Sequence, residues 1–130
     1  MNPSEFIESF LNRLDEVRPE YDWHYRNVGV KDLENQDFLH ELELVCDSWQ
    51  ERSRLATKWR KSRIERRESK NMVAVLEPVV KFLDDEANRK VINRLRGVLG
   101  EVRKQEGALK GKVYRKRVTE EMRKADRNAK

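Results

Sequence analysis

The chain has 130 residues, of which 41% are charged and 37% are hydrophobic, with a net charge of +5. This length predicts one domain, and the low apolar share favours long helices with one buried stripe over a compact multilayer core. Three Trp, three Tyr and four Phe residues argue against a disordered chain. We therefore expect a folded, mainly α protein whose thin core is completed by oligomerisation.

Charge is unevenly distributed along the chain. Residues 1–50 carry twelve acidic and four basic side chains, whereas residues 51–130 carry twelve acidic and 25 basic ones. Halves of opposite charge either pair with each other or leave a basic face for an anionic partner. Cys46 is the single cysteine, and the chain shows neither a signal-peptide pattern nor an apolar run of ~20 residues. We expect a cytoplasmic protein without a membrane segment.

The first helix is predicted to begin at a capping box formed by Asn2 and Glu5. Pro19 is expected to end or kink this helix. Residues 20–30 fit a strand and a helix about equally well, because their aromatic residues alternate but also recur at helical spacing. Asp32 is a candidate N-cap for a further helix over residues 33–47.

The longest continuous helical pattern spans residues 48–83, with a kink expected near Pro78. Acidic residues 84–86 precede a final helical pattern over residues 86–106, where they favour the dipole of that helix. The simplest arrangement of these two segments is an antiparallel helical pair, with the N-terminal helices packed beside it.

Gly97 and Gly100 lie within the last helical pattern and suggest either close helix approach or room for a ligand. Residues 112–118 alternate like a strand and predict a short C-terminal β-like arm. We predict a single helical domain over residues 1–118 and a charged tail over 119–130.

Three groups of residues are candidates for anion binding. The first is a basic helix face, for which phosphate binding competes with simple pairing to acidic residues; it comprises Arg52, Arg54, Lys58, Arg60, Lys61, Arg63, Arg66, Arg67 and Lys70. The second combines cations with an aromatic ring suited to stacking on a base; it comprises Lys110, Lys112, Tyr114, Arg115, Lys116 and Arg117. The third lies near the start of the last helix, where backbone donors favour phosphate; it comprises Phe82, Asn88, Arg89, Lys90, Asn93, Arg94 and Arg96.

Motifs for catalysis, metals or cofactors are absent from the sequence. His24 and His40 are sixteen residues apart without a metal-binding motif, and His40 is expected to be a packed or hydrogen-bonded structural residue. Cys46 lacks the partners of a catalytic nucleophile, and no phosphate-binding glycine motif is present. We expect no cofactor, no metal and no enzymatic activity.

Several short stretches follow one another along the chain: residues 37–44 (DFLHELEL), 66–71 (RRESKN), 76–78 (LEP), 90–95 (KVINRL), 98–104 (VLGEVRK) and 113–118 (VYRKRV). In this order they resemble phage proteins that counter the Thoeris defence of bacteria, specifically the first-described type. The resemblance covers about two-thirds of the chain. It departs at Lys116, where many relatives are expected to have a proline.

Proteins of that family sequester cyclic ADP-ribose isomers, and some hold cyclic oligonucleotides, without cleaving them, as dimers or trimers of dimers. The resemblance implies a homodimer or homohexamer here, with ligand contacts from Phe82, Asn93, Arg115 and Arg117. To these we add Arg60, Arg89 and Tyr114 from the basic groups above.

Two other functions remain open on the sequence alone. The first is nucleic-acid binding in a phage or prophage protein, with the basic face of residues 52–70 following the phosphate backbone. The second is a scaffold that binds an acidic host protein.

Overall fold

Three helices make up nearly all of the chain that the structure describes. The computed structural model describes residues 1–111, 122–123 and 127. The helices are α1 (Pro3–Leu44), α2 (Trp49–Asp84) and α3 (Glu86–Lys110). The prediction of a mainly α protein is confirmed, while the predicted β-like arm over residues 112–118 lies outside the described residues. In the described part, no helix is both long and apolar enough to cross a bilayer.

Helix α1 is longer than the sequence predicted. Its N-terminus has the expected capping box, with the Asn2 side chain accepting from the backbone N–H of Glu5. The helix then continues through Pro19, so the predicted helix end there is wrong and only a kink is compatible with the structure; residues 20–30 are helical, and Asp32 is not an N-cap. Packing offsets the local cost of the proline, because Val17 on one side of it is buried against α2.

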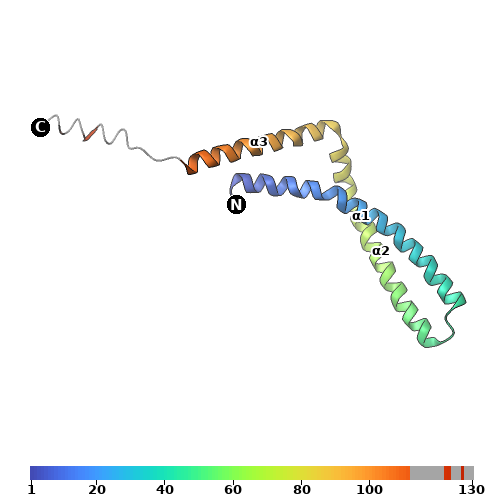
Figure 1. The fold of residues 1–130 in the computed structure, drawn as a ribbon. Coiled ribbons are helices and arrows are strands. Elements are labelled where there is room, and N and C mark those ends of the chain that lie inside the picture. The colour runs from blue at the N-terminus through green and yellow to red at the C-terminus, as the bar shows by residue number, and fades with distance from the viewer. Residues whose placement is uncertain (112–121, 124–126, 128–130) are drawn as a thin grey trace.

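Helix α1 pairs with α2 over residues 17–44, and we call this pair the long arm. Figure 1 shows the two helices side by side and antiparallel, from the connecting loop to the point where α2 crosses α1. Buried or half-buried residues recur at alternating spacings of three and four, which is the pattern of a coiled coil. They are Val17, Tyr21, His24, Val28, Lys31, Asn35 and Phe38 on α1, and Leu55, Trp59, Ser62, Arg66, Ser69, Val73, Leu76, Val80 and Leu83 on α2.

The interface of the long arm is apolar at its ends and polar in its middle. Val17, Leu76 and Val80 form a buried cluster at the crossing. At the loop end, the rings of Phe38 and Trp59 lie 6.3 Å apart beside other apolar residues. Between these ends, the most deeply buried side chains are serines of α2 that face polar residues of α1.

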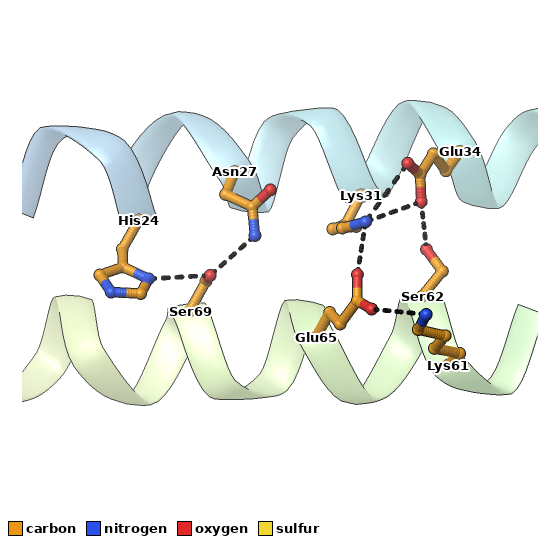
Figure 2. A network of polar contacts seen from close by, with 8 residues as sticks. All are labelled: His24, Asn27, Lys31, Glu34, Lys61, Ser62, Glu65 and Ser69. Carbon is orange, nitrogen blue, oxygen red and sulfur yellow. Dashed lines mark hydrogen bonds and ion pairs between the residues drawn. The ribbon is translucent and has the colours of Figure 1, made fainter. Parts of the chain in front are cut away.

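Figure 2 shows these polar contacts in two groups. In the first, the Ser69 hydroxyl lies 3.0 Å from His24 Nδ1 and accepts from Asn27 at 2.9 Å. Ser69 is only 2% exposed. Because a buried hydroxyl is costly without a partner, these contacts hold one register of the two helices.

The second group centres on Lys31, whose ammonium lies 2.7 Å from Glu65 of α2 and 3.2 Å from Glu34 of α1. The Ser62 hydroxyl donates to Glu34 at 2.7 Å. The hydrogen bond to Glu65 raises the pKa of Lys31, and the hydrogen bond from Ser62 lowers the pKa of Glu34. Both groups therefore favour their charged forms inside the interface.

Helix α3 packs along the first part of α1, and we call residues 3–18 with α3 the short arm. The Ser4 hydroxyl donates to Glu106 at 2.6 Å, and Leu11 and Leu99 are buried farther along. The predicted pairing of 48–83 with 86–106 is therefore replaced by one in which α1 is the main partner of both. The 42 residues of α1 are long enough to accommodate α2 and α3 one after the other.

The junction between α2 and α3 is a single residue. Asp85 ends α2 and also caps α3, since its carboxylate accepts from the N–H of Ala87 at 2.9 Å. The predicted acidic start of the last helix is thus confirmed. Gly97 and Gly100 have no atom of another element near their Cα, so the predicted close helix approach does not occur within the described chain.

Candidate anion-binding cleft

Arginines of α3 and acidic residues of α1 form a regular row along one edge of the short arm. Arg103 pairs with Glu8 at 2.9 Å, and Arg96 pairs with Asp15 at 2.7 Å. The partners on each helix are seven residues apart, which places them on the same edge of a coiled coil. Continuing the pattern by one more heptad would match Arg89 with Asp22.

That third pair is not formed, because from Val17 onward α1 packs against α2, and Asp22 belongs to this part of α1. Arg18 of α1 pairs there with Asp84, the last residue of α2. Arg89 consequently has no ion-pair partner among the residues that the structure places. An arginine released from a repeating row of ion pairs is available to an anion from solution.

A cleft opens at this junction of the three helices, and we call it the corner cleft. Its volume is about 360 Å³, at the lower end of the range for small-molecule sites. The lining residues are Leu14, Asp15, Arg18, Leu83, Asp84, Arg89, Ile92, Asn93 and Arg96. Three guanidinium groups therefore face two carboxylates, beside an amide and three aliphatic side chains.

The two ion pairs in the corner cleft can be exchanged at low cost. The side chains of Arg18 and Asp84, and those of Arg96 and Asp15, are each about half exposed. Exposed pairs of this kind contribute only about 0–1 kcal/mol. An incoming phosphate can compete for the guanidinium groups, because Arg binds phosphate through two parallel hydrogen bonds.

The structure brings two of the predicted ligand-binding residues together, since Asn93 and Arg89 both line the corner cleft. Phe82 lies near the end of α2, half exposed and outside the cleft lining. Arg60 lies on the long arm, in a separate depression that also includes Lys61 and Glu65. Tyr114, Arg115 and Arg117 lie outside the described residues.

Sequence reasoning missed Arg18 and Asp84, which complete the cleft from α1 and α2. The signal that could have indicated the site is the seven-residue spacing of Arg89, Arg96 and Arg103. The same spacing recurs in the acidic residues of α1, so the two rows could have been matched. The predicted helix boundary at Pro19 hid this relationship, because it divided α1 into separate segments.

The basic face of α2 is partly neutralised by α1. Arg66 pairs with Asp32 at 2.6 Å, and Arg63 lies 3.8 Å from the same carboxylate. Lys61 lies 3.9 Å from Glu65 on its own helix. The other cations of this face have no ion pair within the described ranges and are exposed; they are Arg52, Arg54, Lys58, Arg60, Arg67 and Lys70.

The histidines and the cysteine do not cluster. His24 contacts Ser69, whereas His40 is exposed, so the prediction of a packed His40 is wrong. Burial raises the pKa of the Cys46 thiol. No group of three potential metal ligands occurs among the residues described.

Comparisons with protein-family models, with curated proteins and with solved structures find no match to this chain. The resemblance to phage anti-defence proteins thus depends on the short stretches quoted above.

Proposed function

We propose that this protein binds a small anionic nucleotide in the corner cleft and sequesters it without cleaving it. The observation that carries the proposal is Arg89, which lacks an ion-pair partner within the described chain and lines a cleft with Arg18 and Arg96. Arginines converging from two helices suit a ligand with more than one phosphate, since each guanidinium can hold two oxygens.

The shape and the other lining residues of the cleft favour a nucleotide over inorganic phosphate. Leu14, Leu83 and Ile92 supply apolar surface for a ribose or a base, and Asn93 supplies an amide that can both donate and accept hydrogen bonds. The resemblance to Thoeris anti-defence proteins narrows the ligand to a cyclic ADP-ribose isomer, with a cyclic oligonucleotide as the related alternative.

Capture without chemistry agrees with the composition of the cleft. Among the described residues, its lining includes no Ser, Thr, Cys, His or Tyr, and its two carboxylates are ion-paired to Arg18 and Arg96. The pyrophosphate of a cyclic ADP-ribose isomer, or the phosphodiester of a cyclic oligonucleotide, would therefore meet positioning and charge neutralisation but no activated nucleophile among these residues. In this proposal, the predicted ligand residues Phe82, Tyr114, Arg115 and Arg117 also contact the bound nucleotide.

The test is capture followed by release. The protein is incubated with a cyclic ADP-ribose isomer, passed through a size-exclusion filter and heat-denatured, and the released nucleotide is identified by mass spectrometry. Intact ligand is expected. Altered ligand would indicate an enzyme, and absence of capture would refute the proposal.

Substitutions connect capture to the cleft. Arg89→Gln is expected to weaken capture by about tenfold or more, because a charged hydrogen-bonding pair is lost. Lys90→Gln removes a neighbouring exposed cation outside the cleft and is the matched control, with an expected change of less than about twofold. Equal losses in both variants would show that capture depends on overall charge instead of the cleft.

A second function, nucleic-acid binding, is supported by the exposed basic face of α2. Arg60, Arg63, Arg67 and Lys70 alternate at spacings of three and four, so they follow one side of the helix. Binding to a nucleic acid would weaken with salt by about 0.7–0.9 log units per log unit of salt for each phosphate contacted. A titration of a labelled oligonucleotide against salt, with Arg60→Gln/Arg67→Gln as the variant, separates this function from nucleotide capture.

A further inference from the structure

Helix α3 carries a second regular stripe besides the one that packs on α1. Its positions again alternate at spacings of four and three, and all of them are exposed. They are Ala87, Val91, Arg94, Val98, Glu101, Gln105 and Ala108. Val91 and Val98 are 54% and 43% exposed, which is unusual for aliphatic residues at heptad positions of a coiled coil.

The stripe lies on the edge of the short arm opposite the row of ion pairs. Pro3 of α1 and Gln105 of α3 line the same depression. Phe10 lies one heptad after Pro3 on α1, and Val98 lies one heptad before Gln105 on α3. Because the two helices are antiparallel, Phe10 and Val98 are neighbours on this edge. This edge therefore joins the half-exposed ring of Phe10 to the aliphatic stripe of α3.

The same edge is already covered by a helix at its other end. Val17 follows Phe10 by one more heptad, and Val17 is buried by Leu76 and Val80 of α2. Helix α2 ends at Asp84, so nothing from the described chain continues along the edge past Phe10. A helix lying there would extend the packing that α2 begins.

The charges of the stripe select a second copy of this chain as the occupant. Arg94 and Glu101 are related by reversal about the point between Gly97 and Val98, and so are Ala87 and Ala108. When two such helices lie antiparallel with this point at the centre, Arg94 of each copy approaches Glu101 of the other. Neither Arg94 nor Glu101 has an ion-pair partner in the part of the chain that is described.

We infer that the short arm associates with a second copy through α3, antiparallel and two-fold symmetric about the point between Gly97 and Val98. The contact buries Val91, Val98 and Phe10 between two helical pairs, in the manner of a four-helix bundle. Arg89, Arg96 and Arg103 lie on the opposite edge, so the corner clefts of both copies stay open. This inference is independent of the ligand proposed above.

Charge reversal tests the pairing directly. The wild-type chain is expected to sediment with twice its monomer mass at micromolar concentration. Arg94→Glu and Glu101→Arg should each weaken association by about tenfold or more, since each places like charges together twice in the dimer. The double variant Arg94→Glu/Glu101→Arg should restore it, because the opposite charges meet again.

The double variant distinguishes a contact between two copies from an ion pair within one copy. Along one helix the two positions are about 10 Å apart, too far for a direct pair within a single copy. Circular dichroism establishes that each variant is folded. A monomeric wild-type chain, or an oligomer that both single variants leave intact, would overturn the inference.

Cysteine crosslinking tests the centre of the contact. In a Cys46→Ser background, Val98→Cys is expected to form a disulfide-linked dimer on mild oxidation, because two-fold symmetry brings the position close to its own copy. Gly100→Cys is the matched control, since Gly100 is also open to solvent but lies off the stripe. Equal crosslinking at both positions would refute the proposed symmetry.

Discussion

The long and short arms solve the same packing problem in different ways. The long arm buries serines and half-buries a lysine and two glutamates in the middle of its interface, where these groups form hydrogen bonds and ion pairs with one another. The short arm buries leucines in its interface but leaves Val91 and Val98 exposed on one edge and, on the other, an arginine without an ion-pair partner among the described residues. Polar satisfaction makes the long arm specific in register, whereas the short arm presents the surfaces suited to binding.

The largest expected effect comes from breaking the apolar cluster that joins the arms. Leu76→Ala should lower the free energy of unfolding by about 2–5 kcal/mol, because it leaves a cavity against Val17 and Val80. Urea denaturation followed by circular dichroism measures this change. Val75→Ala is the matched control, since Val75 is exposed, and its change should stay within about 0.5 kcal/mol. Similar losses in both variants would contradict the assigned packing of α2.

A smaller effect is expected from the polar middle of the long arm. Lys31→Met removes the ammonium between Glu34 and Glu65 and should cost about 1–3 kcal/mol, because it leaves both carboxylates without their partner. Lys61→Met removes an exposed lysine 3.9 Å from Glu65 and should change stability by less than about 0.5 kcal/mol. Thermal unfolding at neutral pH compares the two. If Lys31→Met leaves the thermal stability unchanged, the interface does not depend on the charge of Lys31.

Lowering the pH should reveal how much ionised carboxylates in both arms contribute to stability. Hydrogen bonds from Ser62 and Ser4 lower the pKa values of Glu34 and Glu106 below their usual 4.5. A lowered folded-state pKa contributes stability above the unfolded pKa, and that contribution disappears as pH falls through the folded value. Thermal melts between pH 6 and pH 3 should therefore show a loss of stability below about pH 4.5.

The two serines separate these contributions. Ser62→Ala should flatten the acid loss that arises in the long arm, and Ser4→Ala should flatten the part that arises in the short arm. An acid profile that neither substitution changes would show that other carboxylates dominate it.

The smallest effect on stability should accompany a large effect on binding. Arg18→Gln removes an exposed pair with Asp84 and should change stability by no more than about 1 kcal/mol. It also removes a guanidinium from the corner cleft and should weaken nucleotide capture by about tenfold. Filter capture and thermal unfolding on the same sample measure both quantities. Strong destabilisation with unchanged capture would show that the pair of Arg18 and Asp84 stabilises the fold and does not bind the nucleotide.

Local signals of the sequence were interpreted correctly where a few neighbouring residues determine the structure. The capping box at Asn2 and the acidic start of α3 are confirmed, because both depend on backbone donors within one helical turn. The helix end predicted as one outcome at Pro19 does not occur, since the local cost of this proline is offset by contacts of Val17 with residues about sixty positions away. Asn93 and Arg89 were identified as candidates, but Arg18 was not, because it joins them only across the α1–α3 interface.

The sequence by itself determined that the chain is helical, where its charges lie and how its first helix is capped, because helical periodicity and capping act over a few residues. Only the tertiary structure decided that α1 is one helix shared by two partners. It also decided that Arg18 pairs with Asp84 of α2 near the place where Arg89 would have paired with Asp22. Such choices depend on packing between segments distant in sequence, and the periodicity of one helix does not specify its partner.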